Sequence, residues 1–218
     1  MTLAELYQKV LTVHYIQLKE RSASFAYERE GETLYLYFEG SNGATDWRTN
    51  FNFPAKPYRE MKNLWFAHRG FLAEWKVIKE RLESQIADKS VRRIIIAGYS
   101  HGGALALLCH EYCVFHREDI AKSIYGYGFG APRVVFLFLG KTLRRRLEHF
   151  FVVRNCRDLV THLPPLVFGF RQAGNLLHIG KGEHYGAISS HYPQNYQTEL
   201  KKLSAEVCPI DEKTHFSS

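Results

Sequence analysis

The stretch that decides the fold is Val91 to His116, centred on Gly98-Tyr99-Ser100-His101-Gly102. It begins with the β-branched run Ile94-Ile95-Ile96, which is typical of a strand buried on both faces of a parallel sheet. A helical pattern from Gly102 to His116 follows. A G-x-S-x-G pattern between a strand and a helix predicts a sharp turn that raises the serine hydroxyl above the sheet. Ser100 is therefore a candidate nucleophile.

Strands and helices alternate on both sides of this turn. We expect further strands over Ser24–Arg29, Thr33–Glu39, Leu64–His68, Ser123–Gly128, Phe151–Asn155 and Leu176–Ile179. We expect helices over residues 3–19, 70–89, 134–150 and 192–204, and a long loop from Ser41 to Pro57. This order predicts one α/β domain over residues 1–218, with a mostly parallel central sheet flanked by helices.

Composition narrows the class of protein. The chain has 218 residues, of which 45% are hydrophobic and 23% charged, so disordered and collagen-like classes are excluded. The net charge of +7 leaves nucleic acid, anionic lipid and acidic substrates open as partners. The basic residues are scattered and match no nucleic-acid-binding motif, so we expect no nucleic acid partner.

The N-terminal segment and the cysteines indicate the cellular compartment of the protein. Glu5 and Lys9 interrupt the apolar run that a signal peptide needs, so residence in the cytoplasm is expected. The four cysteines show no metal-ligand spacing and are expected to be reduced thiols: Cys109, Cys113, Cys156 and Cys208.

A nucleophilic serine needs a carboxylate that orients its base, and in this fold class the acid follows the serine in the chain. Three aspartates follow Ser100. Asp119 comes after the helix predicted from Gly102 to His116 and is predicted to be a surface residue, while Asp211 lies in a polar tail. Asp158 follows a predicted strand at the sheet edge where sites form, so it is the candidate acid.

The base must be a histidine later in the chain. His184 and His191 both precede the last predicted helix. His191 is followed by Tyr192 and Tyr196 at helical spacing, which would anchor it, so we favour His191 and keep His184 as the alternative.

Taken in order, these segments resemble the class 3 lipase family of the α/β-hydrolase fold. The resemblance rests on six segments: Phe38-Glu39-Gly40-Ser41 with Asp46-Trp47, His68-Arg69-Gly70-Phe71, the Ser100 elbow, Phe129-Gly130-Ala131-Pro132-Arg133, Asn155 with Asp158-Leu159-Val160, and His191 with Asn195-Tyr196. The resemblance implies a triad of Ser100, Asp158 and His191. It also implies an oxyanion hole from the backbone N–H groups of Ser41 and His101, and an apolar lid with Trp47, Phe51 and Phe53.

The sequence departs from this family in places. Glu39 stands where fungal and plant members usually carry arginine, and His101 where they carry leucine. The run from Val134 to Leu139 is unusually apolar; we read it as a packed helix, with a patch facing lipid or a partner as the alternative.

The function predicted first is hydrolysis of carboxylic esters, on acylglycerols or other acyl esters, through an acyl-serine intermediate. This chemistry needs no metal or organic cofactor. A second hypothesis is a phospholipase or lysophospholipase at an anionic membrane surface, suggested by the net charge and by Arg144-Arg145-Arg146, although a solvated helix face is the simpler reading of these arginines. A third is a non-catalytic binding protein that retains the fold. The sequence predicts a lipid or acyl ester substrate with peripheral membrane contact, and it predicts no oligomeric state.

Overall fold

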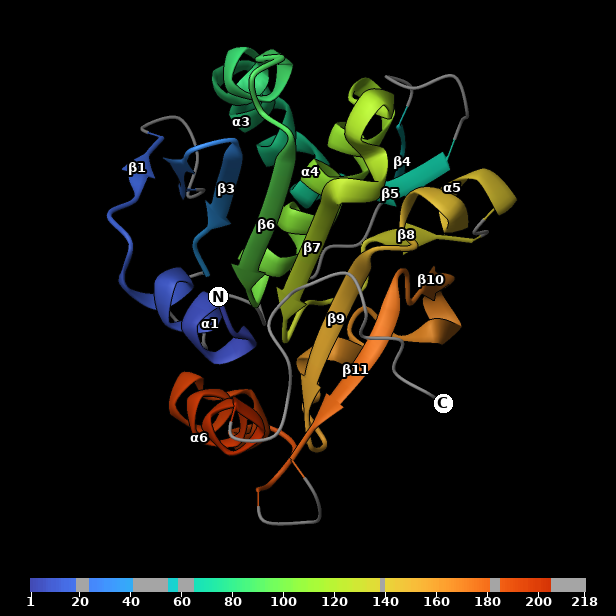
Figure 1. The fold of residues 1–218 in the computed structure, drawn as a ribbon. Helices are drawn as coiled ribbons and strands as arrows, with labels where there is room; N and C mark the ends of the chain where they lie inside the picture. Colours follow the sequence, from blue (N-terminus) through green and yellow to red (C-terminus); the bar gives the residue numbers. More distant parts are fainter. Residues whose placement is uncertain (19–23, 41–54, 59–64, 138–139, 181–184, 205–218) are drawn as a thin grey trace.

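The computed structural model is a layered α/β structure (Figure 1). It describes residues 1–18, 24–40, 55–58, 65–137, 140–180 and 185–204. Helices α3 and α4 cover one face of a central sheet, and α1 and α6 pack together on the other face. The mostly parallel sheet flanked by helices, predicted from the sequence, is confirmed.

The central sheet has seven strands in the order β1-β2-β3-β6-β7-β9-β11. The strands are β1 (Ile16–Gln17), β2 (Ser24–Glu30), β3 (Thr33–Phe38), β6 (Arg93–Tyr99), β7 (Ile124–Phe129), β9 (Phe150–Asn155) and β11 (Asn175–Ile179). Strands β3, β6, β7, β9 and β11 are parallel, while β1 and β2 are antiparallel additions at one edge. The carboxyl ends of the parallel strands therefore meet along one edge, where ligand sites of open α/β sheets form.

A second, antiparallel sheet is made of short strands in the order β10-β8-β5-β4. These are β4 (Ala55–Tyr58), β5 (Trp65–His68), β8 (Val135–Phe136) and β10 (Phe170–Arg171). Residues 55–57, which we expected in a loop, thus belong to a strand. Strand β5 matches the strand predicted over Leu64–His68, whereas β8 and β10 have two residues each, too few to show a two-residue periodicity in the sequence.

The helices are α1 (Leu3–Thr12), α3 (Arg69–Ala87), α4 (His101–His116), α5 (Lys141–Arg146) and α6 (Pro193–Ser204). Short 3₁₀ turns are η1 (Glu118–Ser123), η2 (Val160–His162), η3 (Leu166–Phe168) and η4 (Ser189–His191). Thr2 caps α1 through a capping box with Glu5, whose two hydrogen bonds satisfy amides at the start of the helix.

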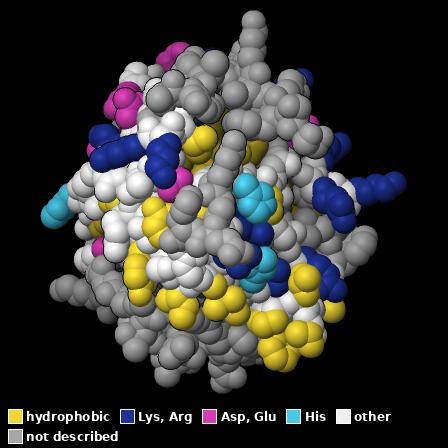
Figure 2. Space-filling view, turned by 90° about the horizontal axis from the view of Figure 1, so that it is seen from below, with side chains coloured by type: hydrophobic (Ala, Val, Ile, Leu, Met, Phe, Trp, Pro, Cys, Tyr) yellow, Lys and Arg dark blue, Asp and Glu magenta, His cyan; other side chains and the backbone are white. Residues whose placement is uncertain are grey.

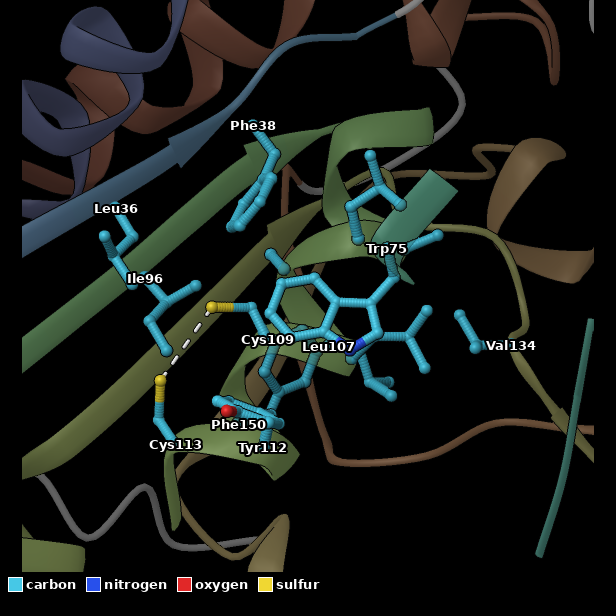
Figure 3. Packing of buried hydrophobic residues seen from close by; sticks show 14 of the residues in the cluster. Leu36, Phe38, Trp75, Ile96, Leu107, Cys109, Tyr112, Cys113, Val134 and Phe150 are labelled. Carbon is cyan, nitrogen blue, oxygen red and sulfur yellow. Dashed lines mark hydrogen bonds between the residues drawn. The ribbon is translucent and has the colours of Figure 1, made fainter. Parts of the chain in front are cut away.

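The larger part of the core lies between the sheet and the helices α3 and α4. Figure 3 shows Trp75 of α3 packed among side chains of α4 and of the strands, with Phe38 and Ile96 facing it from the sheet. The indole Nε1 of Trp75 donates to the hydroxyl of Tyr58 at 3.1 Å, so its one polar atom is satisfied. The second cluster joins α1 and α6 to the opposite face of the sheet.

Two helix predictions were wrong in their extent. The helix expected over residues 3–19 ends at Thr12, because Val13 is already extended and Ile16 begins β1. The helix expected over residues 134–150 is confined to Lys141–Arg146. Val135 and Phe136 form β8 instead, since they pair with β5 and β10, which lie far away in the chain.

The apolar and basic segments of that region also differ from the expectation. Val134 and Val135 are buried, whereas Leu137 has a φ of 65° and is exposed. Arg146 is not simply solvated: it donates to Glu111 at 2.6 Å and lies over the ring of Phe115.

The cysteines within the described residues are free thiols. Cys109 and Cys113 are buried on α4, with their Sγ atoms 3.9 Å apart (Figure 3); Cys208 lies outside the described residues. Across the described parts of the chain, no helix is both long and apolar enough to cross a membrane.

Candidate active site

Ser100 lies at the sharp turn between β6 and α4. Its φ of 54° and ψ of −120° are unusual for a residue with a side chain, and its backbone N–H holds the turn by donating to Phe129 O at 2.7 Å. The turn needs glycine on its strand side, because a Cβ at Gly98 would lie 2.2 Å from Gly102 O. The predicted strand-turn-helix context of Ser100 is thus confirmed.

Ser100, His191 and Asp158 lie in a hydrogen-bonded line. His191 Nε2 is 2.8 Å from Ser100 Oγ, and His191 Nδ1 is 2.8 Å from Asp158 Oδ2. With the ring proton on Nδ1, the imidazole donates to the carboxylate and Nε2 accepts from the hydroxyl. This is the geometry in which a histidine can take the proton of a serine.

Asp158 is fully buried and its carboxylate is surrounded by donors. Oδ2 accepts from His191 and also from the hydroxyl of Tyr196 at 2.5 Å, while Oδ1 accepts the backbone N–H of Val160 at 2.9 Å. Burial raises the pKa of the Tyr196 phenol well above its usual value, and the adjacent Asp158 adds to this shift. Tyr196 therefore remains protonated and keeps donating its hydrogen bond to Asp158.

His191 is held from several sides. The ring of Tyr99 stacks on its imidazole with centroids 5.1 Å apart, and the Tyr99 hydroxyl donates to the backbone carbonyl of His191. Asn155 Nδ2 donates to Ser190 O at 3.0 Å and fixes η4, the turn that carries the base. These contacts restrict the imidazole to one orientation.

Gly130 lies directly against the histidine and the aspartate. Its φ is 62°, and a Cβ there would be 2.9 Å from His191 Cε1 and 3.0 Å from Asp158 Oδ2. Only glycine leaves both groups their space at this position.

His101 occupies the first turn of α4, and its side chain points away from Ser100. Its Nε2 forms a short hydrogen bond with Glu74, and its ring meets Phe71 edge-on. The backbone N–H of a first-turn residue has no acceptor within the helix, and it lies at the positive end of the helix dipole. The backbone N–H of His101 therefore belongs to the helix end beside Ser100.

Five residues predicted for the site lie outside the residues that the structure describes: Ser41, Trp47, Phe51, Phe53 and His184. Asp119, predicted to be a surface residue, is partly exposed and bonds Arg117 and Lys89. Within the described residues, no group of three or more His, Cys, Asp or Glu side chains could hold a metal ion.

The sequence reasoning missed the roles of Tyr196, Tyr99 and Gly130. The sequence marks Tyr196 as an anchor of His191 and as part of the segment that resembles the family, but not as a donor to Asp158. Its helical spacing to His191 marks it as inward-facing, but its bond to Asp158 depends on how α6 packs against the end of β9.

Comparisons with known proteins agree with this architecture. The family model described as Lipase (class 3) matches residues 35–168, which is more than half of the chain. A lipase of Rhizomucor miehei is 28% identical over 81% of this chain and 47% of its own length. A secreted mono- and diacylglycerol lipase of Fusarium solani is 28% identical over 68% of this chain and 44% of its own length. The chain thus spans less than half the length of these curated relatives.

Solved structures show the same fold. A Rhizomucor miehei triacylglyceride lipase superposes with a TM-score of 0.67 and 24% identity, covering 78% of this chain and 66% of the other. A mono- and diacylglycerol lipase of Aspergillus oryzae superposes with a TM-score of 0.62 and 20% identity, over 78% of this chain and 64% of the other. The central sheet and the serine elbow are those of the α/β-hydrolase fold. With the family match over residues 35–168, this chain belongs to the class 3 lipase family.

Proposed function

We propose that this chain hydrolyses carboxylic esters through an acyl intermediate on Ser100. The observation that carries the proposal is the position of His191, with Nε2 2.8 Å from Ser100 Oγ and Nδ1 2.8 Å from Asp158 Oδ2. Serine is a weak nucleophile at neutral pH and needs such a base to accept its proton during attack.

Each residue has a defined part in the proposed reaction. His191 accepts the proton of Ser100 as its oxygen attacks the ester carbonyl, and returns that proton to the departing alcohol oxygen. Water, deprotonated by the same imidazole, then attacks the acyl-serine; the bond to Ser100 Oγ breaks, the imidazolium returns its proton to that oxygen, and the acid is released. Asp158 holds the imidazole in one tautomer and stabilises its charged form.

The tetrahedral intermediate carries a negative charge that needs donors. We assign one of them to the backbone N–H of His101, because it belongs to the first turn of α4 beside Ser100. The second proposed donor, Ser41, and the proposed lid residues Trp47, Phe51 and Phe53 rest on the family resemblance.

We further propose acyl esters of glycerol as the substrate class, met at a lipid surface. Support comes from the names of the relatives, which include mono- and diacylglycerol and triacylglycerol lipases. Exposed apolar side chains adjoin the triad in sequence: Leu159 follows Asp158, and Ile188 and Tyr192 lie on either side of His191.

Turnover of short-chain nitrophenyl esters by Ser100→Ala tests the proposal. We expect turnover to fall to the background rate and labelling by a fluorophosphonate probe to disappear. Ser90→Ala is the matched control, since Ser90 bonds Asp88 on the surface and should leave both readouts unchanged. Undiminished turnover by Ser100→Ala would show that another residue, or no residue, is the nucleophile.

A further inference from the structure

Histidine and acidic side chains both reach the surface at the end of the sheet where β6 finishes and α4 begins (Figure 2). His101 of α4, the residue after the nucleophile, forms a short hydrogen bond through Nε2 with the carboxylate of Glu74 on α3. The two side chains are only 23% and 14% exposed. A hydrogen bond to a charged acceptor is stronger than one between neutral groups, and partial burial protects it from competition with water. The start of α4 is therefore tied to α3 at this point.

An aromatic contact holds the imidazole of His101 in the same direction. The ring of Phe71, on α3, meets it edge-on with centroids 5.1 Å apart. Phe71 in turn packs on the ring of His68, with centroids 4.4 Å apart. Phe71 and Glu74 lie three residues apart and so share one face of α3. The side chain of His101 rests against that face.

His68 lies near the pair of His101 and Glu74 but does not take the place of His101. Burial lowers the pKa of His68 to about 4, and the neighbouring His101 adds to the shift. Glu74 opposes the shift, but less strongly. His68 is therefore uncharged at neutral pH and does not compete as a cation for the carboxylate of Glu74.

The sheet fixes the next residue of the same turn. A Cβ at Gly102 would lie 2.2 Å from Phe38 O and 2.6 Å from Glu39 O, so the backbone of α4 closely approaches the end of β3 there. The first turn of α4 thus contacts β3 through Gly102 and α3 through His101.

The backbone N–H of His101 is the group that these contacts direct. It belongs to the first turn of α4 and has no acceptor within the helix, and we have assigned it to the oxyanion of the tetrahedral intermediate. A donor stabilises that charge best if it points to the oxyanion before the reaction begins, because no energy is then needed to reorient it. Contacts that fix His101 therefore determine how well its N–H can serve as that donor.

We propose that Glu74 is a positioning residue of the oxyanion hole: its hydrogen bond to the imidazole fixes the first residue of α4 and hence the direction of the His101 N–H. The inference rests on the proposed function, because the oxyanion forms only when Ser100 attacks an ester. Family members that carry leucine in place of His101 lack this bond, since a leucine side chain has no polar atom.

Steady-state kinetics on a soluble nitrophenyl ester test the proposal. Glu74→Leu removes the bond, and kcat should fall about tenfold with KM unchanged, because a misdirected donor weakens stabilisation of the transition state and not binding of the ester. Glu74→Gln keeps a side chain that can bond Nε2, so its kcat should stay within about twofold of that of the unaltered chain. Glu80→Leu makes the same exchange as Glu74→Leu at an exposed position of α3 and should leave kcat unchanged.

An inhibitor that mimics the oxyanion gives a second readout. Ser100 Oγ adds to the carbonyl carbon of a trifluoromethyl ketone, the serine proton passes to His191, and the negative charge stays on the former carbonyl oxygen. The inhibition constant should rise about tenfold in Glu74→Leu, in step with the loss of kcat. Partial unfolding would lower the active fraction, which fluorophosphonate labelling counts, without changing this constant.

The double variant His101→Leu/Glu74→Leu tests whether the two residues act through their bond. If they do, it should lose no more kcat than the more impaired of the two single variants. Additive losses would overturn the proposal, as would unchanged kinetics in Glu74→Leu or an equal loss of kcat in Glu74→Gln. Absence of ester turnover by the unaltered chain would instead overturn the proposed function, and this inference with it.

Discussion

The hydroxyl of Tyr196 donates to the same oxygen of Asp158 that accepts from His191, at 2.5 Å and 2.8 Å respectively. One buried carboxylate oxygen thus links the base to a tyrosine of α6. Because the carboxylate is buried, each donor that it keeps helps to fix the position that the imidazole needs.

Tyr196→Phe should lower both activity and stability. Loss of a hydrogen bond to a charged group costs about 1.5–3 kcal/mol, and a similar loss in the transition state reduces kcat/KM roughly tenfold or more. Kinetics on a soluble ester and urea unfolding measure the two effects. Tyr185→Phe removes a hydroxyl that bonds Glu199 instead, so it should leave kcat/KM unchanged. Equal kinetics for the two variants would mean that the Tyr196 bond does not serve the triad.

Asp158→Asn should reduce kcat about 10³- to 10⁴-fold with little change in KM. An amide in place of the carboxylate can donate to Nδ1, which favours the tautomer with Nε2 protonated and unable to accept from Ser100. Asp119→Asn is the control, because Asp119 is a partly exposed carboxylate that bonds Arg117 and Lys89. A drop of less than tenfold in Asp158→Asn would remove Asp158 from the proposed mechanism.

Gly130→Ala should cause a large loss of turnover and only a modest loss of folding free energy. The new Cβ would meet His191 Cε1 at 2.9 Å, and displacement of a reacting group by about 1 Å costs on the order of 100-fold in rate. Gly31→Ala adds a methyl group at nearly the same φ, 58°, with nothing within 4 Å. Both variants should lose about 1–2 kcal/mol of folding free energy to backbone strain, but only Gly130→Ala should lose turnover.

The buried Glu111 should make stability depend on pH. Burial raises its pKa to about 7, against the opposing effect of Arg146, while the unfolded chain keeps a value near 4.5. Between these values the folded protein binds more protons than the unfolded one, so the free energy of unfolding falls as pH rises from about 4.5 to 7. The fall attributable to Glu111 is on the order of 3 kcal/mol.

Glu111→Gln keeps the shape of the side chain and removes its titration. Urea unfolding at several pH values should therefore give a curve that lacks this fall between pH 5 and 7. Arg146→Gln leaves the buried carboxyl without its cation and raises the pKa of Glu111 further, so the fall should extend above pH 7. If Glu111→Gln follows the curve of the unaltered protein, Glu111 stays ionised in the fold.

The sequence predicted those parts of the molecule that depend on local pattern. The Ile94-Ile95-Ile96 run, the glycines around Ser100 and the order of Ser100, Asp158 and His191 mark the strand, the turn and the candidate triad without knowledge of long-range contacts. Parts that depend on distant partners were missed. Val135 and Phe136 lie in an apolar run that we expected to form a helix, but they pair with β5 and β10 and form a strand.

The same distinction explains the site. The helical spacing of Tyr192 and Tyr196 favours His191 over His184 in the sequence. The bonds of Tyr196 to Asp158 and of Tyr99 to the His191 carbonyl arise only when α6 packs on the sheet.

The contact between α1 and α6 gives the first helix a role in function although it supplies no atom to the triad. The Tyr7 hydroxyl donates to Pro193 O at 3.2 Å, its ring packs against Tyr99 and Tyr196, and Gln8 accepts from Gln197. Helix α1 thus packs against Tyr196 and Tyr99, the two tyrosines that contact Asp158 and His191. Removal of residues 1–12 by a protease would leave every triad residue in the polypeptide, yet it should abolish the proposed ester hydrolysis.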